Sequence, residues 1–174
     1  MSNYTLPYYS ESEQYWKKYG VEVPHAGIQY HHNGDAGLDL PIWDSKLTNG
    51  ELSSDGTFML LPGNSVTIKT GVYLGIPEGK YGLLDSRSGT SKMGLDLLCR
   101  TIDQPYRGNI RLAIINLGKE PAILENGKQY FQIIITDYTK VDTVSHDSLE
   151  EFMEHAGETS RGSDGFGSKE RKGK

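Results

Sequence analysis

The sequence predicts an all-β fold, a distorted jelly roll or β-sandwich, with a short additional helix and a flexible C-terminal arm. Short runs of β-branched residues are separated by turn residues at close intervals, as in sandwiches and jelly rolls. The chain has 21 glycines among 174 residues, where average composition gives roughly 12. Three segments are typical of turns between strands: Pro62-Gly63-Asn64, Pro77-Glu78-Gly79 and Asn126-Gly127.

Five segments are expected to form strands. Two of them contain continuous apolar runs, Ala113–Ile115 and Ile133–Ile135, and such runs predict strands that are buried on both faces. The expected strands are Ser65–Lys69, Val72–Ile76, Tyr81–Leu84, Ile110–Asn116 and Tyr130–Asp137.

Two segments are expected to be helical. One is Glu11 to Tyr19, with Ser10 or Ser12 as its N-cap. The other is Asp147 to Ala156, where apolar residues recur at helical spacing and form a stripe that we expect to pack against other residues. The stripe consists of Leu149, Phe152 and Met153.

The chain is expected to have three parts. Residues 1–33 form an N-terminal extension, residues 34–145 a β domain, and residues 146–174 a helical linker with a C-terminal arm. Within the β domain, the polar segment Trp43 to Thr57 is expected to be a surface loop. The arm, Gly157 to Lys174, is rich in glycine and polar residues without periodicity, which predicts flexibility.

Composition limits the classes of function. The net charge of −5 disfavours non-specific nucleic-acid binding, so no direct nucleic-acid contact is expected. The single cysteine, Cys99, excludes an internal disulfide, and its apolar neighbourhood predicts a core residue. No signal peptide is expected, because Met1 to Ser12 is polar and tyrosine-rich, and the sequence has no apolar stretch of ~20 residues. We therefore expect a soluble, cytoplasmic protein without membrane contact, whose origin, including a nuclear or viral one, stays open.

Four segments have the composition of a site for an anionic ligand. An acid lies between apolar residues in Gly37-Leu38-Asp39-Leu40, and a loop from Ser86 to Lys92 combines hydroxyls with two cations. Asp103 lies at a turn before Tyr106, and an arginine and a phenylalanine lie in the glycine-rich segment Arg161 to Ser168. Each segment alone also fits an ordinary turn, strand end or disordered terminus; their joint order favours a site.

Together with Gly127–Gln132, these four segments resemble the five ordered motifs of the trimeric dUTPase family, over about three quarters of the chain. The resemblance implies hydrolysis of dUTP to dUMP and pyrophosphate, which keeps uracil out of DNA and supplies dUMP for dTMP synthesis. It also implies a homotrimer with sites between subunits. The matching segments are Ala36–Leu40, Arg87–Gly89, Thr101–Gly108, Gly127–Gln132 and Arg161–Ser168.

The resemblance also implies roles for individual residues. Asp103 would be the base for water attack on the α-phosphorus, and Asp39 would hold the cofactor Mg²⁺ through a water. The uracil would be read by backbone groups near Thr101, Ile102 and Arg111. The remaining substrate contacts would come from Arg87, Ser88, Gly89, Gln132, Arg161, Gly167 and Ser168, with Tyr106 against the deoxyribose and Phe166 stacked on the uracil.

This sequence departs from the family at several positions. Arg100 replaces a usual glycine three residues before Asp103, and Leu97 replaces an asparagine of many bacterial relatives. Either Arg100 alters the uracil-binding hairpin, or its side chain points outward and leaves the backbone unchanged.

Two alternatives belong to other classes. dCTP deaminase shares the fold, but its catalytic glutamate has no counterpart in Ile110–Ile115. The other is a regulatory role, in which residues 1–33 or 43–57 bind a partner protein. The tyrosines and tryptophan of the N-terminal extension suit either such an interface or subunit packing.

Overall fold

The computed structural model describes residues 4–20, 27–44, 56–160 and 162. The chain divides into two compact units, Met1–Thr139 and Lys140–Lys174. Helix α3 (Leu149–Ala156) belongs to the second unit, and the strands belong to the first. Among the described residues, no helix combines the length and apolar character needed to cross a bilayer.

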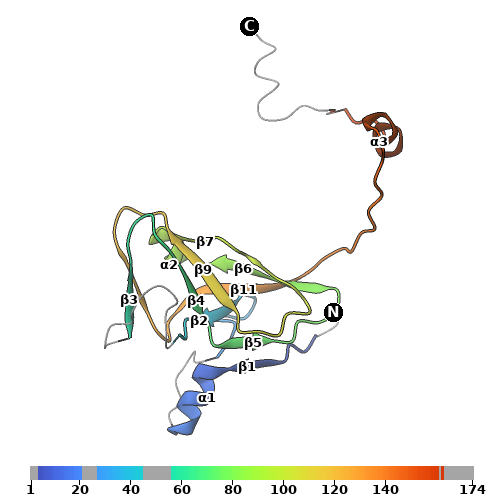
Figure 1. The fold of residues 1–174 in the computed structure, drawn as a ribbon. Helices are drawn as coiled ribbons and strands as arrows, with labels where there is room; N and C mark the ends of the chain where they lie inside the picture. Colours follow the sequence, from blue (N-terminus) through green and yellow to red (C-terminus); the bar gives the residue numbers. More distant parts are fainter. Residues whose placement is uncertain (1–3, 21–26, 45–55, 161, 163–174) are drawn as a thin grey trace. The chain divides into compact units, whose positions relative to one another are not determined.

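Two antiparallel sheets form the body of the first unit. The larger has the strand order β2-β11-β6-β8, and the smaller has the order β4-β9-β7. Figure 1 shows β4 and β9 crossing in front of β2 and β11. These strands are β2 (Leu38–Pro41), β4 (Ser65–Lys69), β6 (Lys80–Ser86), β7 (Leu95–Leu97), β8 (Thr101–Ile102), β9 (Arg111–Asn116) and β11 (Gln129–Asp137).

Two further strand pairs extend the body, β10 with β3 and β1 with β5. The all-β prediction is confirmed, and the five expected strands lie where the sequence places them, with ends shifted by a few residues. Asn126-Gly127 forms the predicted turn before β11, where Gly127 has φ +86°, a value that favours glycine. The added strands are β1 (Tyr8–Ser10), β3 (Thr57–Leu60), β5 (Val72–Leu74) and β10 (Ala122–Glu125).

The N-terminal segment adds β1 and helix α1 (Glu11–Lys18) to the edge strand β5. Ser10 is the N-cap: its hydroxyl accepts a hydrogen bond from Glu13 N at 3.4 Å, which satisfies one free donor of the first turn. The predicted helix and the first of its two candidate caps are therefore confirmed. Tyr8, Tyr9 and Tyr15 are about half exposed in the single chain.

The hydrophobic core draws side chains from both sheets. Phe131 and Ile133 of β11 are fully buried, as are Leu112 and Ile114 of β9. Their neighbours along each strand are only partly buried, so burial alternates. The prediction that these strands are buried on both faces is wrong for the described part of the first unit, because only one face of each strand is buried there.

Two other expectations are wrong. Cys99 is exposed, because it lies in the turn between β7 and β8 rather than in a strand. Asp44, expected in a surface loop, is 3% exposed and accepts a hydrogen bond from Lys69 N at 3.1 Å. Within the second unit, helix α3 buries none of its residues, and the expected packing of its apolar stripe stays a prediction. Residues 45–55 of the expected loop lie outside the described residues.

Candidate active site

The strand register places three polar side chains in one row. Gln132 of β11 pairs with Asp39 of β2 on one side and with Asp85 of β6 on the other. Paired residues of antiparallel strands project to the same face, and the flanking Phe131 and Ile133 project to the core. We call this feature the Asp39–Gln132–Asp85 row. It is the polar counterpart of the buried face of the same sheet.

Gly37 leaves space for the central residue of the row. A Cβ added at Gly37 would overlap the side-chain amide of Gln132. The glycine of the first motif therefore has a packing reason: any larger residue would displace Gln132 from its place beside Asp39.

Arg87 lies at one end of the row and compensates its buried acid. Its Nη1 is 3.0 Å from Oδ2 of Asp39, and the side chains are 33% and 5% exposed. The same nitrogen donates to Gln129 O at 3.1 Å. A guanidinium has five N–H donors, so donors remain for an anion on its exposed side.

The loop that carries Arg87 is tied to β11. Arg87 N donates to Tyr130 O at 3.3 Å, and the Thr90 hydroxyl donates to the same carbonyl. Ser88 and Gly89 open the short helix α2 (Ser88–Lys92) and are exposed. A Cβ added at Gly89 would meet nothing within 4 Å. The packing of the chain therefore does not require this glycine, and the loop presents an open backbone surface beside Arg87.

Tyr130 also supports this loop. Burial raises the pKa of its phenol above the ordinary value, so the hydroxyl stays protonated at neutral pH. The hydroxyl accepts a hydrogen bond from Glu125 N at 3.1 Å. The ring is thus held at the β10–β11 hairpin while its backbone carbonyl anchors the Arg87 loop.

A second group of predicted residues lies on the turn between β8 and β9. Tyr106 N donates to Asp103 O at 3.1 Å, and the Tyr106 hydroxyl donates to Asn109 O at 2.8 Å. A Cβ added at Gly108 would overlap the Tyr106 phenol, so Gly108 permits this folded position. Asp103 is exposed, and its carboxylate is accessible for chemistry.

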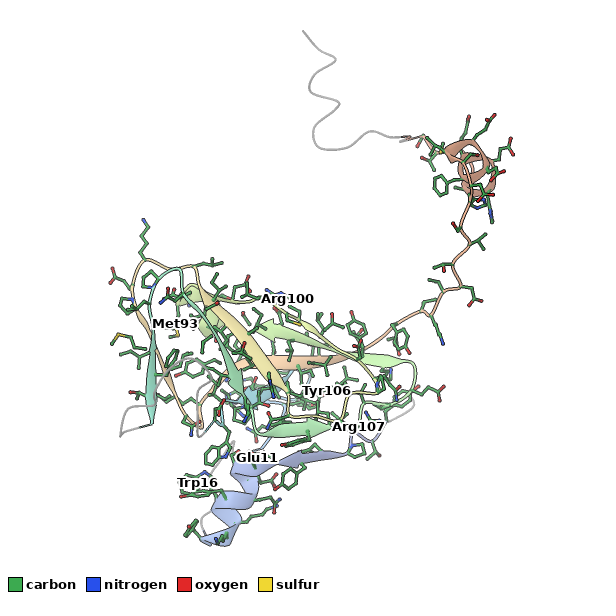
Figure 2. All side chains as sticks on the ribbon, viewed as in Figure 1. Glu11, Trp16, Met93, Arg100, Tyr106 and Arg107 are labelled. Atoms are coloured by element: carbon green, nitrogen blue, oxygen red, sulfur yellow. The ribbon has the colours of Figure 1, made fainter. Side chains whose placement is uncertain are left out.

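Tyr106 and Arg111 line a polar pocket of about 350 Å³. Glu11 of α1 also lines it and accepts hydrogen bonds from Tyr73 Oη at 2.9 Å and Asn109 Nδ2 at 3.4 Å. Figure 2 shows Glu11 at the start of α1 and Tyr106 on the stretch that precedes β9. The sequence contained no indication that Glu11 reaches this pocket, because its partner Asn109 is 98 residues away.

The two groups are separate within one chain. Ile102 pairs with Gly82 of β6, whereas Arg87 lies five residues further along from Gly82. At ~3.3 Å per strand residue this corresponds to roughly 16 Å. Asp103 continues away from Arg87, because β8 runs antiparallel to β6. The chain thus assembles Asp39, Arg87, Ser88, Gly89 and Gln132 in one group, and Thr101, Ile102, Asp103, Tyr106 and Arg111 elsewhere.

The predicted residues of the fifth motif lie outside the described part of the chain. These are Arg161, Phe166, Gly167 and Ser168. Among the described residues, no group of three or more His, Cys, Asp or Glu side chains is arranged to hold a metal ion. The row offers at most two carboxylates, those of Asp39 and Asp85, so a metal there would also depend on ligands from water and an anion.

Sequence reasoning missed one charged cluster beside the row. Arg100 contacts both Asp85 and Asp96, and its carbonyl accepts a hydrogen bond from Leu84 N at 2.7 Å. The β ladder is therefore kept at this position while the side chain makes two ion pairs. The approach of Arg100 to Asp85 depends on the pairing of β6 with β8, which no local motif specifies.

The fold is all-β, and its larger sheet brings a carboxylate, an amide and a guanidinium together beside the exposed Ser88-Gly89 loop. These features define a jelly-roll protein with a site for an anion. The sequence profile of the dUTPase family matches residues 25–169, and the chain belongs to that family. The deoxyuridine 5'-triphosphate nucleotidohydrolase of Mesorhizobium japonicum is 37% identical over 155 residues, which cover 85% of this chain and 87% of that protein.

Solved structures have the same fold. The dUTPase of Staphylococcus bacteriophage 80alpha superimposes with a TM-score of 0.67 at 25% identity, over 96% of this chain and 99% of that one. The dUTPase of phage phi11 of S. aureus, described with a structural Mg(II) ion, has a TM-score of 0.61 at 24% identity, over 84% and 99% of the two chains. The jelly-roll prediction is confirmed by these similarities.

Proposed function

We propose that this protein hydrolyses dUTP to dUMP and pyrophosphate. The observation that carries the proposal is the first group, in which Asp39, Gln132 and Arg87 meet beside the exposed Ser88-Gly89 backbone. Guanidinium, amide and backbone N–H groups suit a phosphate chain. Membership in the dUTPase family adds the nature of the nucleotide.

The chemistry requires a base and a means of stabilising charge. Asp103 would orient and deprotonate the water that attacks the α-phosphorus, and its exposed carboxylate is suited to this. Arg87 would neutralise charge on the phosphates, while the Ser88 hydroxyl would face the bridge to the leaving pyrophosphate. Arg161, Gly167 and Ser168 would bind the far end of the phosphate chain, and Phe166 would stack on the uracil.

Substrate selection would depend on the second group. Tyr106, held by Asn109 O at 2.8 Å, would pack against the deoxyribose and leave no space for a 2′-hydroxyl. Backbone groups near Thr101, Ile102 and Arg111 would pair with the uracil edge, and a cytosine would leave buried polar groups unpaired.

Mg²⁺ is the proposed cofactor, and the residues of the row fit it. Mg²⁺ is commonly bound through one or two carboxylates together with substrate phosphates and waters. Asp39, 4% exposed at the row, is suited to hold it through a water. When bound, the ion would neutralise phosphate charge as the leaving group departs.

A homotrimer would unite the two groups. The backbones of the two groups are roughly 16 Å apart along β6, and a second copy that supplies either the base or the phosphate-binding residues would bring both to one α-phosphorus. We propose that each site joins Asp103 of one copy with Asp39 and Arg87 of another. The cytoplasmic location and a regulatory partner at residues 1–33 or 43–57 stay predictions.

The test is pyrophosphate release from dUTP, UTP, dTTP and dCTP with Mg²⁺, for the wild type and Asp103→Asn. We expect release from dUTP alone, and a loss on the order of 10²-fold or more in the variant. Equal release in the variant would remove Asp103 as the base. No release from any nucleotide would contradict the proposed hydrolysis, and ammonia from dCTP would indicate deamination.

A further inference from the structure

Arg100 joins two acidic residues on different strands. Its Nη1 lies 2.9 Å from Oδ1 of Asp85 on β6, and its Nη2 contacts Oδ1 of Asp96 on β7. All three side chains are 38–48% exposed. Figure 2 shows Arg100 well away from Glu11 and Tyr106, so this cluster is distinct from the polar pocket.

The cluster adjoins the phosphate-binding group. Asp85 is the third member of the Asp39–Gln132–Asp85 row and pairs directly with Gln132. It also precedes Arg87 by two residues. Neighbouring strands are ~4.8 Å apart, so the Asp85 carboxylate is one strand away from the side chain proposed to support the phosphates.

Without Arg100, this edge of the site would carry two uncompensated carboxylates. A nucleoside triphosphate is a polyanion, and like charges within about one Debye length, ~8 Å at physiological salt, repel it. Exposed ion pairs contribute little to folding stability. The cluster is therefore better suited to shape the potential at the site than to hold the fold together.

We propose that Arg100 is a positioning residue for triphosphate binding, which acts by neutralising Asp85 and Asp96 beside the phosphate-binding residues Gln132 and Arg87. This inference rests on the proposed function and adds a residue to it. Arg100 lies three residues before Asp103 in the sequence, and the effect is expected at the phosphate end of the substrate rather than at the base.

The test compares KM and kcat for dUTP, with Mg²⁺, in a charge series at low and physiological salt. In Arg100→Ala we expect KM to rise on the order of fivefold to tenfold at low salt, with kcat within about twofold. The rise should shrink at higher salt, because screening weakens the repulsion. Arg100→Lys should keep most of the wild-type KM.

The deciding variant removes the acids as well. The triple substitution Asp85→Asn, Asp96→Asn, Arg100→Ala should return KM to within about twofold of the wild type. A purely structural role for Arg100 would not be rescued in this way, because the ion pairs stay absent. The matched control is Lys80→Ala, which removes a cation paired with Asp137 at the other end of β6 and should leave KM unchanged.

A fourth variant does not depend on removing Arg100. Asp85→Asn with Asp96→Asn in the wild-type background leaves an unpaired cation and should lower KM below the wild-type value. A KM rise in Arg100→Ala that the triple variant does not reverse would overturn the inference, as would an unchanged KM in both Arg100→Ala and the double variant. If the wild type hydrolyses dUTP, these results bear on Arg100 alone; if it releases no pyrophosphate, both proposals fall.

Discussion

Arg87, in the loop before α2, forms an ion pair with Asp39 on strand β2, with 3.0 Å between Nη1 and Oδ2. The carboxylate is nearly buried and the guanidinium is about one-third exposed. Asp39, which is proposed to hold the metal, thus also positions Arg87, which is proposed to bind the phosphates. A change at either residue should alter both folding stability and ligand binding.

Arg87→Ala should destabilise the fold as well as abolish hydrolysis. The substitution leaves a buried carboxylate without its cation, which costs about 3 kcal/mol in comparable pairs. Urea denaturation measures this free energy of unfolding. Arg107→Ala is the control, because that arginine is exposed and, within the described residues, donates only to the backbone carbonyls of Gln104 and Tyr106. Equal stability of the two variants would contradict a structural role for the Arg87–Asp39 pair.

Gly89→Ala should separate folding from function. The added Cβ meets nothing within 4 Å, and alanine is favoured over glycine in a helix by up to ~1 kcal/mol. The melting temperature should therefore stay the same or rise, while KM for dUTP rises about tenfold or more because the methyl group blocks the phosphates. Gly37→Ala should instead lower stability, since it displaces Gln132. A fully active Gly89→Ala would place the phosphates elsewhere.

Mixing two inactive variants should restore activity. In a trimer that joins Asp103 of one copy to Arg87 of another, Arg87→Ala and Asp103→Asn chains refolded together in equal amounts leave about a quarter of the sites intact. A site built within one chain would leave none. Pyrophosphate release from the mixture, compared with each variant alone, decides between these two arrangements.

Gly108→Ala should weaken the discrimination between dUTP and UTP. The added Cβ overlaps the Tyr106 phenol, so the ring must leave the position in which it would exclude a 2′-hydroxyl. The ratio of kcat/KM for the two nucleotides should fall about tenfold. Tyr106→Phe keeps the ring and loses only its hydrogen bond to Asn109 O, so a smaller change is expected. An unaltered ratio in Gly108→Ala would show that sugar selection does not depend on this ring position.

Removal of Mg²⁺ should stop hydrolysis without unfolding the protein. The described residues contain no cluster of three or more metal-ligating side chains, so the metal is expected to bind with the substrate. EDTA should abolish pyrophosphate release and change the melting temperature by less than about 2 °C. A large drop in melting temperature would instead indicate a structural metal in the folded chain.

The sequence predicted the strands and the site residues better than the strand pairing that brings those residues together. Asp39, Arg87 and Gln132 were each identified from their motifs, and these three do converge. Their convergence depends on the pairing of β2 and β6 with β11, between residues up to 95 positions apart, and no local pattern contains that information. The separation of Asp103 from Arg87 follows from the register of β8 on β6, and this register could not be predicted from the sequence either.

The wrong predictions have a common physical cause. Cys99 has apolar neighbours in sequence, yet it lies in a turn, where neighbours in sequence are not neighbours in space. Asp44 belongs to a polar segment, yet its hydrogen bond with Lys69 N compensates its burial. For Arg100 the backbone pairing of the second alternative is found, but the side chain binds two acids, which neither alternative contained.

The separation of the two groups also determines how many active sites one defective subunit inactivates in an assembly. If each site takes its base from one copy and its phosphate-binding residues from another, every chain serves two different sites. A single subunit that lacks both Arg87 and Asp103 would then inactivate two sites, whereas a subunit that lacks only one of these residues would inactivate one site. An excess of doubly defective chains should therefore suppress the activity of intact ones out of proportion to their number.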